Sequence, residues 1–142
     1  MISVSILEKL IEGYEGWLKP EAVFQEDTVS GGIALHLENG TVDKIQPVVE
    51  LPHRTALRSV PGVLSVGFID LQVNGGGGVM LNNDPTAEGV LTIARAHRLG
   101  GTVGLLPTVV TDRPEIIRKA AEAVLAVWGQ EGVLGIHIEG PH

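Results

Sequence analysis

Three apolar segments of strand length mark the C-terminal half of the chain, and two amphipathic segments lie between them. Each strand-like segment is followed within a few residues by glycine or proline, which end regular structure. Their starts recur about every 30 residues, the spacing of parallel βα units with right-handed crossovers. The pattern therefore predicts a β-α-β-α-β arrangement, with strands at about residues 68–74, 102–110 and 133–139.

The two amphipathic segments carry the start and stop signals of helices. Asp84-Pro85 supplies an N-cap and a first-turn proline for the first helix, which is expected to stop at Gly100-Gly101. Asp112 is an expected cap for the second helix, and Gly129 closes it. Pro107 lies inside the second predicted strand. Because proline cannot donate a hydrogen bond to the sheet, we expect a bulge or irregular pairing at this position.

The N-terminal part of the chain has a different pattern. Residues 5–18 carry a capping-box pair at their start and an apolar stripe at helical spacing, with Pro20 after them, so they predict an amphipathic helix used for packing. Residues 32–45 alternate between apolar and polar on both sides of Asn39-Gly40, a strong two-residue turn signal. The sequence therefore predicts a β-hairpin there, and a loop over residues 52–62.

Polar side chains gather near the C-terminal ends of the first and third strands of the second half. By strand alternation, Asp70, Gln72 and Asn74 share one face, and so do His137 and Glu139. A histidine and a carboxylate at a strand end are costly to bury without a partner. Either these side chains reach solvent, or they form a metal or acid–base site. In parallel α/β folds, active sites are built at this end of the strands.

Composition and charge exclude several classes of protein. Of 142 residues, 44% are hydrophobic and 19% charged, which is globular composition rather than disorder. The absence of cysteine excludes disulfides and thiolate metal sites. The net charge of −7 argues against a nucleic-acid surface. The start of the chain has no secretory apolar region and no apolar run approaches a membrane span, so we expect a cytoplasmic protein without a membrane partner.

Several catalytic motifs can also be excluded. The glycines at 75–78 lack the third glycine of a dinucleotide fingerprint and the lysine of a P-loop. The His-x-Glu of zinc nucleobase deaminases requires cysteine ligands, and no Gly-x-Ser-x-Gly elbow is present. A metal-dependent hydrolase is the remaining interpretation of the polar strand ends. A bound divalent cation lowers the pKa of water and polarises an amide carbonyl, and amide hydrolysis needs both effects.

Three motifs of the chain resemble the family of N-acetylglucosamine-6-phosphate deacetylases, which are metal-dependent hydrolases of the amidohydrolase superfamily. The motifs are Gly67–Gly78, Leu105–Thr111 and Gly135–Pro141, and the resemblance runs from about Gly32 to the last residue. It implies an α/β fold: the first βα units of a TIM-type (β/α)8 barrel, preceded by part of a small β-sandwich. The implied division is an N-terminal helix at 1–20, sandwich and linker at 21–66, and barrel units at 67–142.

The resemblance also implies roles for individual residues. Glu139 matches a metal ligand of the family. Many superfamily members carry His-x-His at the end of the first strand, where this chain has Gln72-Val-Asn74. Amides are weaker ligands than imidazole, so this substitution implies one divalent metal per site, zinc before other divalent ions. Gln72 would then position the metal-bound water, and Asn74 and His137 would support the ligands without touching the metal.

The activity implied is removal of the N-acetyl group from N-acetylglucosamine 6-phosphate in amino-sugar catabolism, giving glucosamine 6-phosphate and acetate. The galactosamine isomer is an alternative substrate, and a non-catalytic fragment or assembly module is an alternative of another class. A complete barrel takes eight βα units and roughly 250 residues. We therefore expect the chain to be an N-terminal portion that is inactive alone, with two metal histidines and a catalytic aspartate beyond residue 142. The resemblance also favours a homodimer.

Overall fold

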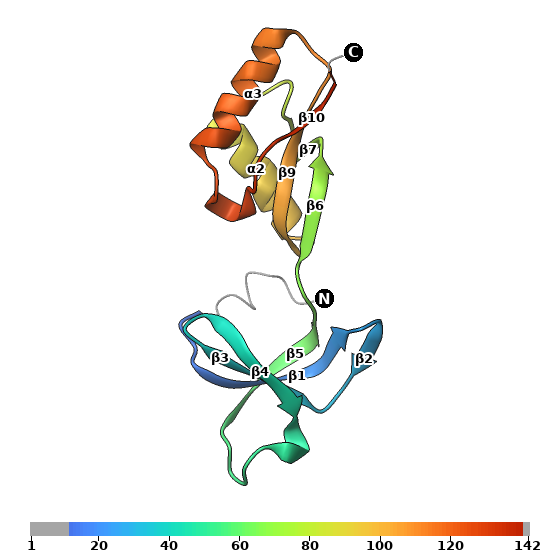
Figure 1. The fold of residues 1–142 in the computed structure, drawn as a ribbon, viewed down its shortest axis with the longest axis vertical. Coiled ribbons are helices and arrows are strands. Elements are labelled where there is room, and N and C mark those ends of the chain that lie inside the picture. Colours follow the sequence, from blue (N-terminus) through green and yellow to red (C-terminus); the bar gives the residue numbers. More distant parts are fainter. Residues whose placement is uncertain (1–11, 141–142) are drawn as a thin grey trace. The chain divides into compact units, whose positions relative to one another are not determined.

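The computed structural model describes residues 12–140 and divides the chain between Val66 and Gly67 into two compact units (Figure 1). Each unit has its own sheet and its own buried cluster of apolar side chains. Among the described residues, no helix is long and apolar enough to cross a membrane.

The first unit is a five-stranded sheet. The strand order is β2-β1-β3-β4, and β5 pairs parallel with β1 on the same sheet. Buried Leu18, Leu37 and Val60 form its small core. The strands are Gly16–Gln25 (β1), Thr28–Ser30 (β2), Ile33–Glu38 (β3), Thr41–Pro47 (β4) and Leu57–Leu64 (β5), with a short 3-10 helix at Val48–Glu50 (η1).

The predicted hairpin of the first unit is confirmed. β3 and β4 pair antiparallel on either side of Asn39-Gly40. Asn39 has φ +52° and Gly40 φ +71°, the left-handed conformation that a two-residue hairpin turn requires at both central positions.

The predicted helix over 5–18 is wrong at its C-terminal end, because β1 begins at Gly16 and Leu18 pairs with Leu35 of β3. Gly13 and Gly16 have φ +63° and +118°, which a right-handed helix does not contain. Residues 5–11 of the prediction lie outside the described residues. The apolar residues at 14, 17 and 18 fit helical spacing, but tertiary pairing decided their conformation.

The predicted loop over 52–62 is also wrong for its second half, which belongs to β5. Pro61 and Gly62 interrupt the apolar pattern there and gave the signal of a loop. The structure accommodates them as a register shift: Val60 pairs with Pro20 and Val63 with Ala22, so β5 carries one more residue than β1 in that interval.

The second unit is a parallel sheet covered by helices on one face. Its three main strands lie in the order β10-β9-β6 and are mutually parallel, which confirms the predicted β-α-β-α-β arrangement. The elements are Phe68–Val73 (β6), Gly75–Gly76 (β7), Val79–Met80 (β8), Ala87–Arg98 (α2), Thr102–Val110 (β9), Pro114–Ala126 (α3), Gln130–Gly132 (η2) and His137–Glu139 (β10).

The third strand is shorter than predicted, because regular pairing begins only at His137. Val133 makes an isolated bridge to Leu105, and His137 pairs with Thr108. Leu105 and Thr108 are three residues apart on β9, whereas Val133 and His137 are four apart. The segment before β10 therefore has one extra residue, which interrupts the ladder.

The helix starts also differ from the predicted ones. Thr86, not Asp84, is the N-cap of α2, and its hydroxyl accepts a hydrogen bond from the Gly89 N–H at 3.1 Å. Asp84 supports it by accepting from the same hydroxyl at 2.8 Å. The N-cap of α3 is Arg113 instead of the expected Asp112, and no side chain caps that helix, although Pro114 occupies its first turn.

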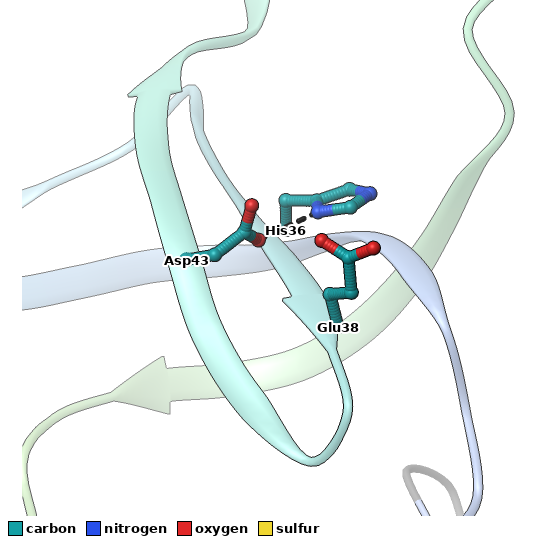
Figure 2. Close-up of side chains that lie close together, drawn as sticks. All are labelled: His36, Glu38 and Asp43. Carbon is teal, nitrogen blue, oxygen red and sulfur yellow. Dashed lines mark hydrogen bonds and ion pairs between the residues drawn. The ribbon is translucent and has the colours of Figure 1, made fainter.

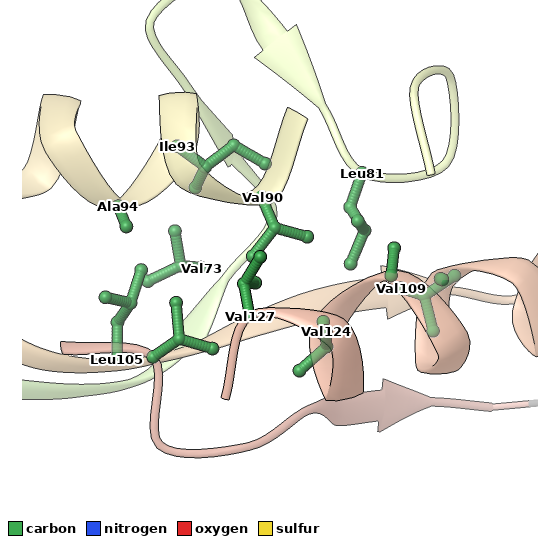
Figure 3. Packing of buried hydrophobic residues seen from close by; sticks show 12 residues of the cluster. Val73, Leu81, Val90, Ile93, Ala94, Leu105, Val109, Val124 and Val127 are labelled. Carbon is green, nitrogen blue, oxygen red and sulfur yellow. The ribbon is translucent and has the colours of Figure 1, made fainter. Parts of the chain in front are cut away.

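The core of the second unit lies between the sheet and the two helices (Figure 3). β9 supplies Leu105 and Val109 to it, and Val73 of β6 and Leu81 extend it. The remaining buried apolar side chains come from the helices and from the segment after α3: Val90, Ile93, Ala94, Ala120, Ala123, Val124, Val127 and Val133. Large apolar side chains of the flanking strands stay exposed, namely Phe68, Ile69, Leu71 and Ile138.

Ile93→Ala is expected to destabilise the second unit by about 2–5 kcal/mol, because the side chain is fully buried between α2 and the sheet and its removal leaves a cavity. Leu99→Ala, at a site 73% exposed, is the matched control and should change the free energy of unfolding by less than about 0.5 kcal/mol. Urea unfolding followed by circular dichroism measures both. Equal effects of the two substitutions would contradict this placement of the core.

Candidate active site

Gln72 and Glu139, both predicted as site residues, meet at the C-terminal end of the parallel sheet. Gln72 lies in β6 and Glu139 in β10, the strands that flank β9. The Gln72 Nε2 donates a hydrogen bond of 2.8 Å to Glu139 Oε2, across 67 residues of sequence. Both side chains are exposed. The pair therefore spans the middle strand and faces solvent.

A bulge in β6 places Gln72 for this contact. Asp70 pairs with Leu105 and Val73 with Pro107, so β6 has two residues where β9 has one. The irregular pairing expected at Pro107 is thereby confirmed. Bulges bend a strand and redirect side chains, and they are frequent beside active sites. The Asp70 carboxylate accepts a hydrogen bond from the Gln72 N–H at 3.1 Å, which holds the bulged segment.

The chemistry of the pair determines its orientation. An ionised carboxylate only accepts hydrogen bonds, so the amide NH2 of Gln72 must face Glu139, and its carbonyl oxygen is left for a donor. Within residues 12–140, no further hydrogen bond or ion pair reaches the Glu139 side chain. An exposed carboxylate with a free oxygen fits a ligand of a divalent cation, although one carboxylate alone does not make a site.

Asn74 and His137, the other predicted site residues, do not hydrogen-bond to the pair. The described residues show no hydrogen-bond partner for the Asn74 side chain. Its backbone carbonyl accepts a hydrogen bond from the Leu81 N–H at 3.4 Å. His137 Nδ1 is buried and has no hydrogen-bond partner in the described part of the chain. Their support of the metal ligands stays a prediction.

The glycine run after β6 forms a tight hairpin against α2. Gly77 and Gly78 have φ +61° and +81° and make the turn between β7 and β8. A Cβ on Gly76 would lie 2.9 Å from His97 Cδ2, so a larger residue there would require the His97 ring to shift. The His97 Nε2 lies 2.9 Å from the carbonyl oxygen of Gly75 and fastens the hairpin to the helix. Sequence reasoning missed His97, because its helical position gives no signal of this contact.

Asn82 holds the following segment to the end of β9, a contact that sequence reasoning also missed. Its side chain donates to the Val110 carbonyl at 3.1 Å and accepts from the Val110 N–H at 3.0 Å, as a neighbouring strand would. The same amide donates to Asp112 at 2.9 Å. This hydrogen bond, together with one from the Arg113 N–H, holds the pKa of Asp112 below its ordinary value.

A second group of potential metal ligands lies in the first unit (Figure 2). His36 and Glu38 of β3 and Asp43 of β4 place one ligand atom each within 4.8 Å of one another. The His36 Nδ1 is 2.6 Å from Asp43 Oδ1, and this hydrogen bond lowers the pKa of Asp43. The contact joins the two strands of the hairpin, and Trp17 lies against the imidazole with ring centroids 5.0 Å apart. None of the residues predicted for the site belongs to this group.

Comparison with known proteins gives a consistent result. The chain is 49% identical over 87 residues to an N-acetylgalactosamine-6-phosphate deacetylase of Shewanella sp. (strain ANA-3), which covers 60% of this chain and 22% of that protein. It is 38% identical over 84 residues to the human N-acetylglucosamine-6-phosphate deacetylase, covering 56% and 20%. The crystal structure of N-acetylglucosamine-6-phosphate deacetylase from Pasteurella multocida matches with a TM-score of 0.73 at 29% identity, over 90% of this chain and 35% of that one.

The chain is similar to part of the amino-sugar-6-phosphate deacetylases. This confirms the resemblance predicted from the three motifs. The chain spans about a fifth of the length of these two curated relatives and about a third of the solved chain. No family model matches it. At the level of fold class, an α/β chain with mostly strands matches a deacetylase structure.

Asn82→Leu is expected to raise the pKa of Asp112 toward its ordinary value, because the strongest hydrogen bond to the carboxylate is lost. A pKa that is lower in the folded than in the unfolded state stabilises the fold above the unfolded pKa, and this stabilisation disappears as the pH falls through the folded pKa. The variant should therefore lose less stability than the parent on acidification. Carbon-detected NMR titration of the carboxyl measures the pKa. Asn83→Leu, at an exposed side chain without a hydrogen bond in the described residues, is the control and should leave the pKa unchanged.

Proposed function

We propose that this chain supplies part of the active site of an amino-sugar-6-phosphate deacetylase, which hydrolyses the N-acetyl group of N-acetylglucosamine 6-phosphate to glucosamine 6-phosphate and acetate. The observation that carries the proposal is the hydrogen bond between Gln72 and Glu139. It joins two of the three motifs by which the chain resembles these enzymes, at the strand ends where parallel α/β folds build active sites.

The same proposal assigns the two units. The unit that follows Val66 represents the first βα units of a (β/α)8 barrel, and the five-stranded sheet of the first unit represents part of a small sandwich domain. The parallel order β10-β9-β6 with helices on one face supports this assignment, because successive strands of a barrel are neighbours and its helices lie outside. A cytoplasmic location, expected from the sequence, and a homodimer, which the resemblance favours, complete the proposal.

One divalent cation per site, zinc in the first place, belongs to the proposed enzyme, and Glu139 would be the ligand from this chain. The bound cation would polarise the acetamide carbonyl and lower the pKa of water. The exposed carboxylate, with one oxygen held by Gln72 and the other free, supports this role. The neutral Gln72 and Asn74, in place of a histidine pair, support one metal rather than two.

Gln72 has two functions in this proposal. Its amide NH2 holds Glu139 in one orientation, and its carbonyl oxygen accepts a hydrogen bond from the water that attacks the acetamide. Orienting that water requires no change of protonation in Gln72, because an amide is neutral throughout the physiological pH range. Asn74 and His137 would support the metal ligands without touching the metal.

N-acetylgalactosamine 6-phosphate is a second candidate substrate, and one specific observation favours it. The chain is 49% identical to the Shewanella N-acetylgalactosamine-6-phosphate deacetylase over 87 residues. It is 38% identical to the human N-acetylglucosamine-6-phosphate deacetylase over 84 residues. The two sugars differ in the orientation of one hydroxyl group, which Gln72 and Glu139 at the acetamide would not read. Assay of both phosphorylated sugars distinguishes them.

Activity is best tested in a protein of the relatives' length. In a suitable chimera, this chain replaces the third of the Pasteurella multocida deacetylase that it matches, because that match covers 90% of this chain. Glu139→Gln in the chimera should lower metal affinity and turnover by more than roughly 100-fold, the largest loss typical of residues that only support a metal ligand. The substitution keeps the size of the side chain and removes the negative charge. Metal analysis, melting temperature and acetate release measure the effect.

Glu115→Gln is the control, because Glu115 is an exposed glutamate in the first turn of α3 and has no part in the proposed site. It should leave metal content and turnover unchanged. A folded parent chimera that releases acetate from neither sugar would overturn the proposed function. Full metal content and turnover in Glu139→Gln would remove this residue from the site.

The parent chimera is also expected to contain about one metal equivalent per chain, because the histidine pair that would hold a second ion is replaced by Gln72 and Asn74. Elemental analysis of freshly purified protein checks the number. Two tightly bound equivalents, one of which is lost in Gln72→Leu, would contradict the one-metal arrangement.

A further inference from the structure

The motif Leu105–Thr111 in and after β9 contributes no side chain to the Gln72–Glu139 pair, yet it lies between the two strands that do. Its two threonines, Thr108 and Thr111, each use the hydroxyl to contact a different flanking strand. Both contacts fall within one residue of the pair. The motif therefore links the middle strand to the two residues of the site.

Thr108 bonds the strand that carries Gln72. The residue is fully buried, and its Oγ1 accepts a hydrogen bond of 2.9 Å from the N–H of Val73, the residue that follows Gln72. The same hydroxyl donates to the Leu106 carbonyl at 3.1 Å. At the bulge opposite Pro107, the Val73 N–H has the Thr108 hydroxyl as its acceptor instead of a backbone carbonyl. Thr108 therefore satisfies a buried N–H that the irregular ladder does not.

Thr111 bonds the strand that carries Glu139. Its Oγ1 donates to the backbone carbonyl of Glu139 at 3.2 Å. The next residue, Gly140, has φ +111°, and a Cβ there would overlap the Thr111 hydroxyl. The turn after Glu139 is thus fitted against Thr111, and only glycine satisfies both the conformation and the space.

The geometry of the pair makes such fixation necessary. Strands on opposite sides of β9 are about 10 Å apart, twice the spacing of neighbouring strands. Gln72 and Glu139 reach each other only by leaning over β9 from both sides. A slip of one residue moves a strand by about 3.3 Å, more than a 2.8 Å hydrogen bond tolerates. β6 contains an irregularity beside Gln72, and a second one interrupts the ladder just before β10, so regular ladder bonds alone do not fix the positions.

We propose that Thr108 and Thr111 are positioning residues, which fix Gln72 and Glu139 at hydrogen-bonding distance from the two sides of β9. This inference rests on the proposed function, because it assigns to Leu105–Thr111 the task of aligning that site. The threonines act through the backbone of Val73 and Glu139 and touch neither the cation nor the substrate.

Thr111 gives the cleaner test, because it is exposed and its replacement leaves no cavity. Thr111→Val keeps the shape of the side chain and removes the hydroxyl, and Thr111→Ser restores the hydroxyl. Thr102→Val is the matched control: Thr102 opens the same strand at its far end, and the described residues show no hydrogen bond of its side chain. All three are made in the chimera with the Pasteurella multocida deacetylase.

In Thr111→Val, a crystal structure is expected to show the Gln72 Nε2–Glu139 Oε2 distance beyond hydrogen-bonding range. Metal affinity should fall roughly 10- to 100-fold, with a lower kcat and an unchanged KM, because orientation of the ligand is lost while the sugar contacts remain. Thr111→Ser should restore all three quantities, and Thr102→Val should leave them as in the parent.

The structural readout separates this inference from the proposed function. A parent chimera without deacetylase activity would reject the function, whereas the Gln72–Glu139 distance in Thr111→Val still judges the positioning. An unchanged distance with unchanged metal affinity in a folded Thr111→Val protein would overturn the inference. Equal losses in Thr111→Val and Thr102→Val would also overturn it, because the effect would then be general to β9. Thr108→Ser and Thr108→Val repeat the comparison on the side of Gln72.

Discussion

Parallel pairing of β6 and β10 on either side of β9 determines the second unit. Parallel strands need crossover connections, and the two helices that provide them cover the face on which Leu105 and Val109 are buried. The C-terminal ends of all three strands then lie at one edge of the sheet. Residues 67 positions apart in the sequence meet there, so the site is a product of the sheet's topology and not of a local motif.

Much of this unit could be predicted from the sequence, because apolar segments of strand or helix spacing and the glycines or prolines that end them are local signals. β9 was predicted with the bounds it has, and Pro107 indicated the irregularity that the structure shows as a bulge. Strand alternation placed Gln72 and Glu139 on polar faces at strand ends. Their meeting follows from parallel topology, which the spacing of the elements also predicted.

The predictions that failed depended on tertiary contacts. A helix through Leu18 fits the apolar spacing, but pairing of β1 with β3 and β5 outweighs that preference. Pro61 and Gly62 suggest a loop, but a register shift admits them into a strand. The side-chain contacts of Thr108 and Asn82 with distant backbone have no sequence signal, because a threonine or asparagine bonds whichever group the fold brings near.

The glycine hairpin after β6 limits which amino-acid substitutions this edge of the protein can accept during evolution. A methyl group on Gly76 would lie 2.9 Å from the His97 ring, and one on Gly77 would lie 3.0 Å from Thr92 Cγ2. A side chain at either position would therefore require His97 or Thr92 of α2 to shift, so the hairpin tolerates substitution poorly. Change at this edge of the sheet is therefore more easily accommodated in neighbouring segments that already carry side chains than in the glycine hairpin.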